Sequence, residues 1–285
     1  MYIEKIHNFF PKYQNIALWK YIYILQWANT KNFDDHKMEK DFLLTLILMR
    51  FWEIFPELVF KWWTCLNKIY FPYFRLSEDL DFAISQEVWR DMRRQILKKY
   101  ESTLSIELEK LWLTLREERT KYDEHRLALF TFEYVSVIDA SLQTIKIDIS
   151  LKWELILPSV QWIIQSPYRD KILEEDLFEN HTISCIDLSE ALAEKMRAAL
   201  TRNIPAIRDF FDIWYVKHFS DFDFGSDEFA QLLEKKLDEV WCIYTLDDAY
   251  DILESQIVTD LVPVLHDEYD FHLREVYEFI QSFRK

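Results

Sequence analysis

Glycine is almost absent from this chain. Its 285 residues include a single glycine, Gly225, whereas average usage of about 7% would give roughly 20. Phosphate-binding loops that need two or more glycines are therefore excluded, both the Walker A loop and the dinucleotide-binding G-x-G-x-x-G turn. The G-x-S-x-G elbow of serine hydrolases is excluded for the same reason. Tryptophan, by contrast, occurs 11 times.

Cysteine and histidine are too few and too scattered to form a metal or disulfide framework. The three cysteines, Cys65, Cys185 and Cys242, are odd in number, far apart, and form no C-x-x-C pair. The seven histidines are dispersed, and the stretch from His266 to Glu268 lacks the second histidine of an H-E-x-x-H zinc site. We therefore expect a reduced, cytoplasmic protein.

A basic excess is also missing. The formal net charge is -16, whereas a protein that coats long nucleic acids usually has a basic surface. This leaves open a local basic pocket for a nucleic-acid end, or a basic protein partner. The densest basic run is usually a solvated helix face, but it is also the best candidate for an RNA-backbone contact: Arg90, Arg93, Arg94, Lys98 and Lys99.

No stretch of the sequence is long and apolar enough to predict a membrane span. The richest run, residues 42–60, is interrupted by Arg50, Glu53 and Glu57. Residues 1–5 lack the basic and then apolar layout of a signal peptide. Half of the residues are hydrophobic and 17% are aromatic, which is enough to build a sizeable core.

The spacing of apolar residues predicts strands in the middle of the chain and helices on either side. Helices are expected at 13–29, 35–55 and 86–100, a helical turn or two at 64–70, and strands at 58–61 and 79–84. Further strands are expected at 105–116, 126–137, 143–151 and 181–187. Helices follow at 189–202, 206–218, 227–240, 246–256 and 267–283, with Ser189 and Ser226 as N-terminal signals. This order predicts an α+β protein with an α/β domain over 1–165 and a mainly helical domain over 166–285.

The sharpest local pattern is a pair of aspartates two residues apart. Asp79 and Asp81 share one face of the expected strand at 79–84, while Leu80 and Phe82 point to the other. Neighbouring carboxylates repel each other unless a cation lies between them, and hard oxygen ligands suit magnesium. Asp148, the lone acid on the polar face of the strand at 143–151, is a candidate third ligand that would complete a two-metal site.

The alternative is that such a pair is only a solvated strand end. Asp221 and Asp223 have the same spacing, and we interpret them as a loop before the helix cap at Ser226. The surrounding sequence separates the two cases.

Several ordered motifs resemble the AbiEii/AbiGii family of nucleotidyltransferases, the toxins of type IV toxin–antitoxin and abortive-infection systems. The stretch F-K-W-W-T-C-L-N-K at 60–68, followed by R-L-S-E-D-L-D at 75–81, is similar to the family's F-K-G-G-T-x-L-x-K and R-x-S-x-D-x-D. Downstream, E-K-M-R-A at 194–198, Arg202 and R-D-F-F-D at 208–212 resemble its helical E-K-x-x-A, R and R-D-x-x-D block. The resemblance extends over roughly residues 40–220.

The resemblance implies a polymerase-β-like mixed sheet with flanking helices, followed by a C-terminal helical bundle that contributes to the active-site cleft. It implies that Asp79, Asp81 and Asp148 bind magnesium, or manganese in its place, and act in catalysis. It places Thr64 and Ser77 near the nucleotide phosphates, and gives Lys61, Lys68 and Arg75 the task of holding phosphate charge or bracing the acidic strand. Catalytic roles in the distal part of the site fall to Lys195, Asp209 and Asp212. From the residues alone, Lys195 reads as a solvated helix lysine, and Arg208 with Asp212 as a surface ion pair.

The chain departs from the family at one turn, where Trp62 and Trp63 replace two consecutive glycines. Glycines let the backbone approach a triphosphate and adopt conformations that side chains forbid, whereas two indoles crowd the same path. Three explanations compete: nucleotide binding is lost while the fold is kept, the turn is rebuilt so that the indoles stack on a base, or tryptophans have replaced glycines, naturally or artificially. The near absence of glycine beside excess tryptophan makes the third worth stating.

Two hypotheses follow. The first is an enzyme that transfers a nucleotide from an NTP to an acceptor, with RNA (a tRNA end) as the first choice and a protein hydroxyl as the second, and with a cognate antitoxin protein as partner. The second is a catalytically disabled relative that binds a protein or a nucleic acid.

Overall fold

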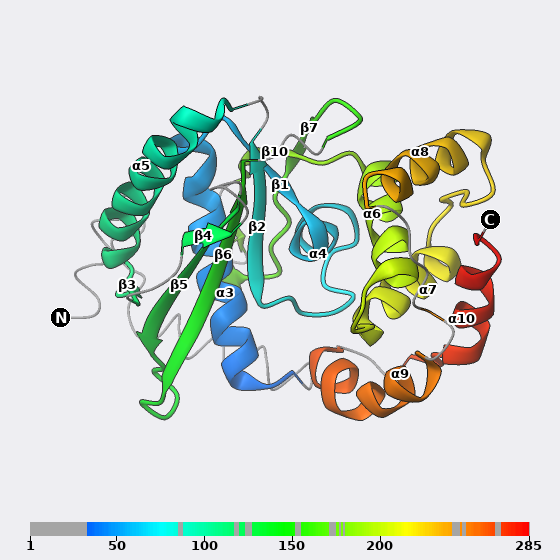
Figure 1. Ribbon diagram of the computed structural model, residues 1–285. Coiled ribbons are helices and arrows are strands. Elements are labelled where there is room, and N and C mark those ends of the chain that lie inside the picture. The colour runs from blue at the N-terminus through cyan, green and yellow to red at the C-terminus, as the bar shows by residue number, and fades with distance from the viewer. Residues whose placement is uncertain are drawn as a thin grey trace. The chain divides into compact units, whose positions relative to one another are not determined.

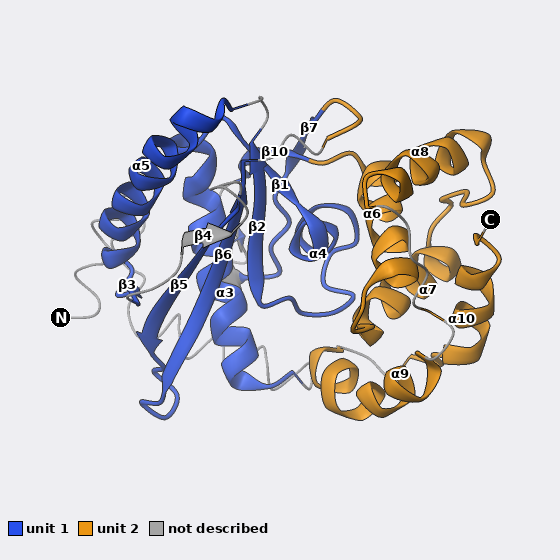
Figure 2. Cartoon of the chain, viewed as in Figure 1, with its two compact units in different colours: residues 1–154, 159–185 blue, residues 155–158, 186–285 orange. Residues whose placement is uncertain are grey.

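The computed structural model describes residues 33–84, 88–116, 120–122, 127–151, 155–170, 175–176, 178, 180–240, 246, 249–265 and 269–284 (Figure 1). The helix expected at 13–29 lies outside these residues. The chain forms two compact units, one of residues 1–154 and 159–185, the other of residues 155–158 and 186–285 (Figure 2). Residues 159–185 group with the first unit because β7 and β10 belong to its sheet, whereas the short segment 155–158 groups with the second unit.

A mixed sheet forms the centre of the first unit. Its seven-strand path runs β3-β5-β6-β2-β1-β10-β7, and β4 pairs with β5. The strands are β1 (Leu58–Lys61), β2 (Asp79–Ile84), β3 (Thr114–Leu115), β4 (Thr120–Tyr122), β5 (Leu127–Val135), β6 (Leu142–Ser150), β7 (Val160–Ile163) and β10 (Thr182–Cys185). Two pairs, β2 with β6 and β1 with β10, are parallel, whereas the other pairs are antiparallel. A separate ribbon pairs β8 (Arg169–Asp170) with β9 (Glu175–Asp176).

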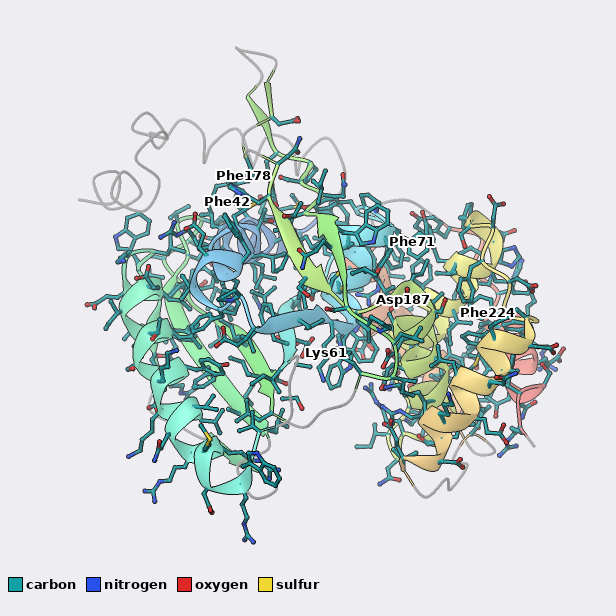
Figure 3. The ribbon with its side chains drawn as sticks, turned by 90° about the horizontal axis from the view of Figure 1, so that it is seen from above. Phe42, Lys61, Phe71, Phe178, Asp187 and Phe224 are labelled. Atoms are coloured by element: carbon teal, nitrogen blue, oxygen red, sulfur yellow. The ribbon has the colours of Figure 1, made fainter. Side chains whose placement is uncertain are left out.

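Helix α3 (Asp35–Ile54) covers one face of this sheet. It starts at Asp34, whose carboxylate accepts a hydrogen bond from the Lys37 amide at 3.0 Å, as an N-cap does. Phe51 stacks on Phe82 of β2, with 4.4 Å between ring centroids, so the apolar side of β2 faces α3. Phe42 lies beside Phe178, 5.6 Å away between ring centroids (Figure 3). In Figure 1, α3 lies to the left of β2 and α4 (Trp62–Cys65) to its right.

Helix α5 (Arg90–Glu109) corrects one expectation from the sequence. Residues 105–116 were expected to form a strand, but the helix continues to Glu109 and only Thr114 and Leu115 pair as β3. The apolar residues recur at helical rather than alternating spacing, because Leu97, Tyr100, Leu104 and Leu108 are its buried side chains. The other strands expected from 58 to 187, and the turn at 64–70 (α4, then η2 at Leu66–Tyr70), are confirmed within a few residues.

The second unit is helical. Its elements are α6 (Leu188–Thr201), α7 (Ile207–Phe219), α8 (Asp227–Asp238), α9 (Tyr250–Gln256), η4 (Ile257–Leu261), η5 (Val262–Val264) and α10 (Leu273–Gln281). Ser226 caps α8 as expected, but the cap of α6 is Asp187, whose carboxylate accepts from the Ser189 amide at 2.8 Å. Helix α10 is shorter than expected, since it begins at Leu273 rather than at 267. Within the described part of the chain, no helix combines the length and apolarity that a membrane crossing needs.

Candidate active site

Three neighbouring strands bring charged residues side by side. Asp81 on β2 is the register partner of Lys61 on antiparallel β1 and of Asp148 on parallel β6. Because Leu80 and Phe82 are fully buried and Phe82 packs on α3, strand alternation directs Asp79 and Asp81 to the opposite face. The structure thus brings the three predicted carboxylates onto two adjacent strands.

The acidity of Asp148 is perturbed by its surroundings. Burial, and after it the nearby charge of Asp79, raise the pKa of Asp148, and Lys61 and Lys146 oppose the shift, so that the pKa is about 6. Its Oδ1 atom is buried and has no hydrogen-bond partner among the described residues. A carboxylate in this state gains from a cation, or from a proton donor, placed at Oδ1.

A metal site is not formed with the side chains as they stand. Among the described residues, no group of three or more histidine, cysteine, aspartate or glutamate side chains is arranged to hold an ion. The donor chemistry nevertheless fits magnesium, because it consists of hard carboxylate oxygens and because Asp79 and Asp148 destabilise each other's charge. Ligation requires the side chains of Asp79, Asp81 and Asp148 to turn toward a common point.

Two hydroxyls meet at the head of β2, one from the turn after β1 and one from the segment that leads into β2. Thr64 Oγ1 lies 2.7 Å from Ser77 Oγ and donates to the carbonyl oxygen of Asp79. Both side chains are buried. The residues predicted to lie near the phosphates therefore form one cluster with the start of the acidic strand.

Trp62 has a backbone conformation that suits glycine. Its φ angle is 62°, in the left-handed region where L-residues with a side chain are strained. Its ring centroid is 4.2 Å from Lys61 Nζ and 5.9 Å from the ring centroid of Trp63. The backbone at Trp62 therefore has a conformation that favours glycine, and its indole lies over the ammonium of Lys61. Lys61 is labelled in Figure 3.

The other two predicted phosphate-binding cations are enclosed. Arg75 is 1% exposed and donates from Nη1 to the carbonyl of Leu76 at 2.9 Å. Lys68 is fully buried and donates to Asp41 Oδ1 at 2.7 Å. Neither of these contacts reaches the acidic strand β2, and the roles of both residues stay predictions.

The second unit contains its own buried ionic cluster. Lys195 on α6 pairs with Asp209 Oδ1 at 3.1 Å and with Asp212 on α7, and Arg202 lies 3.2 Å from Asp209 Oδ2. Lys195, Asp209 and Asp212 are each no more than 2% exposed. The sequence placed these three together on the resemblance alone. The interpretation from the residues alone, a solvated Lys195 and a surface ion pair between Arg208 and Asp212, is wrong because Lys195 and Asp212 are buried.

Sequence reasoning missed two buried ionic clusters. One joins Asp41 to Lys68, and the other joins Lys236 Nζ to Glu190 Oε1 at 2.8 Å and to Glu194 Oε1 at 2.9 Å. Glu190 also accepts from the amides of Ile156 and Leu157, both at 2.7 Å, which holds the inserted segment 155–158 in the second unit. A charged residue inside an apolar helical run, such as Asp41, is the only sequence signal for these clusters.

Comparison with known proteins identifies relatives of the whole arrangement. A family model described as the nucleotidyl transferase AbiEii toxin of type IV toxin–antitoxin systems matches residues 48–281. Among solved structures, the nucleotidyltransferase toxin MenT4 from Mycobacterium tuberculosis is 16% identical, with a TM-score of 0.63, over 92% of this chain and 88% of that chain. JHP933 from Helicobacter pylori is 18% identical, with a TM-score of 0.49, over 88% of this chain and 91% of that chain. The similarity to MenT4 shows a shared fold. No curated protein matches the sequence.

Proposed function

The chain belongs to the AbiEii family of nucleotidyltransferase toxins, and from this premise we propose that it transfers a nucleotide from an NTP to a hydroxyl of RNA with the help of magnesium. The observation that carries this proposal is the row of Lys61, Asp81 and Asp148 across three strands, beside the hydroxyls of Thr64 and Ser77. The two aspartates of the row offer ligands for a cation and Lys61 offers a positive charge to a bound triphosphate. Thr64 and Ser77 offer hydroxyl groups beside them.

In this proposal Asp79, Asp81 and Asp148 hold the metal ion, which, when bound, neutralises charge on the phosphate oxygens. Lys61 offers a nearly buried ammonium to the triphosphate, and Thr64 and Ser77 offer hydroxyls to its oxygens. The acceptor hydroxyl attacks the α-phosphorus, a new P–O bond forms, the bond to the β-phosphate breaks, and pyrophosphate leaves. In this proposal Asp148 receives the hydroxyl proton through Oδ1, a carboxylate oxygen that has no hydrogen-bond partner among the described residues.

The remaining assignments rest on the family. Lys195 is proposed to bind phosphate charge, with Asp209 and Asp212 orienting its ammonium. A tRNA end is the first choice of acceptor and a protein hydroxyl the second. The proposed partner is a cognate antitoxin protein, and the proposed compartment is the cytoplasm.

A second candidate function is favoured by one observation. The indoles of Trp62 and Trp63 lie at the turn where the family has glycines, beside Lys61. A chain blocked in this way keeps the fold and acts as a binding module. The double substitution Trp62→Gly with Trp63→Gly separates the two functions, since a blocked chain binds no NTP until the glycines are restored, whereas an active chain already binds it.

The proposal is tested by titrating each NTP with magnesium into the chain in a calorimeter. We expect magnesium-dependent binding that Asp81→Asn reduces at least tenfold, while the distant control Asp223→Asn leaves it unchanged. Binding that is equally tight in Asp81→Asn would remove the acidic strand from the nucleotide site.

A further inference from the structure

Lys68 is fully buried and lies in a polar network next to the Thr64 turn. Its ammonium donates to Asp41 Oδ1 at 2.7 Å, to Thr45 Oγ1 at 2.8 Å and to the Tyr73 hydroxyl at 2.8 Å. An ammonium has three N–H donors, and these three contacts use all of them. A phosphate would have to displace one of these partners to contact Lys68.

The network joins segments that are far apart in the sequence. Asp41 belongs to α3, and its second oxygen, Oδ2, accepts from the Tyr168 hydroxyl at 2.7 Å. The Lys68 carbonyl accepts from the Gln165 amide at 2.7 Å, in the same segment as Tyr168. Helix α3, the segment η2 and residues 165–168 are therefore held to one another around a single ion pair.

The helical segment anchored by Lys68 also carries a residue of the proposed active site. Thr64 precedes Lys68 by four residues, about one helical turn, and contacts Ser77 Oγ and the Asp79 carbonyl. Residues 62–70 are thus fixed at one end to the acidic strand and at the other end to α3. Movement of the Lys68 end shifts the hydroxyl at the Thr64 end.

Stability alone is a poor reason for this ion pair. Burial lowers the pKa of Lys68, while the charge of Asp41 opposes the shift. Folding therefore removes two charged groups from water, which costs free energy. Apolar side chains of similar volume often replace a buried ion pair without loss of stability. Unlike an apolar contact, a hydrogen-bonded ion pair is directional, so it fixes the position of the segment that carries it.

We propose that Lys68 and Asp41 are positioning residues that set the Thr64 turn against the head of β2 so that its hydroxyls meet the NTP phosphates. This inference rests on the proposed nucleotidyl transfer for its functional consequence. Its structural part, the anchoring of residues 62–70, stands independently.

The test replaces both charges at once, with Asp41→Leu and Lys68→Met. Hydrogen–deuterium exchange without nucleotide is expected to rise in residues 62–70 and to stay as in the wild type in α6 and α7, because the segment loses its directional anchor. Steady-state kinetics are expected to show a KM for NTP raised about tenfold. Tyr73→Phe, which removes one hydrogen bond and no charge, is expected to cause a smaller rise of the same kind.

Each result decides the inference. Unchanged exchange in residues 62–70 of the folded double variant would overturn the anchoring, and faster exchange with wild-type KM and kcat would overturn its functional consequence. If the double variant fails to fold, Tyr73→Phe decides by the same two readouts. A wild-type chain that transfers no nucleotide would refute the proposed function. The exchange experiment would still test whether Lys68 and Asp41 anchor residues 62–70.

A separate observation concerns the tryptophans. Trp112 has a φ angle of 60° and follows the end of α5, where its amide donates to the Glu109 carbonyl at 3.0 Å and the Leu113 amide donates to the Leu108 carbonyl at 3.1 Å. This pair of hydrogen bonds is a Schellman motif, and Trp112 occupies its left-handed position, where glycine is usual. Among the seven tryptophans that the structure describes, Trp214 alone is buried, although tryptophan is highly buried on average.

We infer that positions 62 and 112 are glycines in the polypeptide as its own organism makes it. The single glycine among 285 residues agrees with this inference. Peptide mass spectrometry of the protein isolated from its source is expected to find glycine at 62 and 112, and tryptophan at the buried position 214. Tryptophan at both 62 and 112 would overturn the inference.

Discussion

Asp81 and Asp148 are direct register partners on the parallel strands β2 and β6, with Lys61 opposite Asp81 on β1. The side chains of Asp81, Asp148 and Lys61 therefore lie next to one another on one face of the sheet, and the other face packs on α3. The pKa of Asp148 reports this crowding, because burial and the charge of Asp79 raise it from 3.8 to about 6. Several consequences are measurable without any knowledge of the acceptor.

The first prediction concerns the pH dependence of stability. The folded state binds the Asp148 proton more tightly than the unfolded state, so the free energy of unfolding falls as the pH rises from about 4 to about 6. The loss is about 2 kcal/mol, allowing for partial exposure of the group. Asp148→Asn should therefore have a higher free energy of unfolding than the wild type at pH 7.5 and a similar one at pH 4. Urea denaturation in the presence of EDTA measures both values. Equal stability at both pH values would show that the carboxylate is not strained.

The second prediction concerns metal addition. Magnesium with a non-hydrolysable NTP should raise the Tm of the wild type, because a ligand that binds only the folded state at about 100 times its Kd adds about 2.7 kcal/mol. EDTA should reverse the rise, and Asp79→Asn should abolish it. Near pH 6 the same binding should release a proton from Asp148, which calorimetry in buffers of different ionisation enthalpy detects. Binding without proton release would place the ion away from Asp148.

The third prediction concerns the left-handed tryptophans. Trp112→Gly should raise the free energy of unfolding by about 1 kcal/mol, because it removes left-handed strain from a residue with a side chain. Trp62→Gly should gain less, since it also loses a cation–π contact with Lys61 worth about 0.5–1 kcal/mol. Trp214→Gly, in the buried interior of α7, is the matched control and should lose about 3 kcal/mol or more. Destabilisation by all three substitutions would contradict the glycine-like reading of positions 62 and 112.

The fourth prediction concerns Lys195. Removing its ammonium leaves the carboxylates of Asp209 and Asp212 buried without that countercharge, so Lys195→Ala should cost about 3–5 kcal/mol. Lys235→Ala, a neighbouring helix lysine on α8 that is exposed, serves as the control. A thermal unfolding curve like that of the wild type would assign Lys195 a purely catalytic role.

Much of the fold follows from the sequence because its signals are local. Alternation at 79–84 and 143–151 predicts the strands and the faces of Asp79, Asp81 and Asp148, and the register of β2 with β6 then brings these acids together. The strand expected at 105–116 was wrong. Apolar residues four apart, such as Leu104 and Leu108, fit both the alternation of a strand and one turn of a helix, so a short segment does not distinguish the two. The burial of Lys68 and Lys195 was beyond local reasoning, since it depends on partners 27 and 14 residues away.

The positions of the site residues relative to substrate stay predictions. What sequence pattern and family resemblance could not provide was the left-handed backbone at Trp62, because a φ angle is set by how β1 enters α4 rather than by the residue type. The structure has a backbone conformation that favours glycine at a position occupied by tryptophan, in the turn after β1.

The most direct test of the account is transfer of label from an α-labelled NTP to total RNA in the presence of magnesium. The wild type, Asp81→Asn and the double substitution Trp62→Gly with Trp63→Gly are compared, with Asp223→Asn as the control for loss of an acid elsewhere. The account predicts labelled RNA that requires Asp81 and that increases when the glycines are restored. Label on RNA that persists in Asp81→Asn, or its absence from the glycine-restored chain, would contradict it.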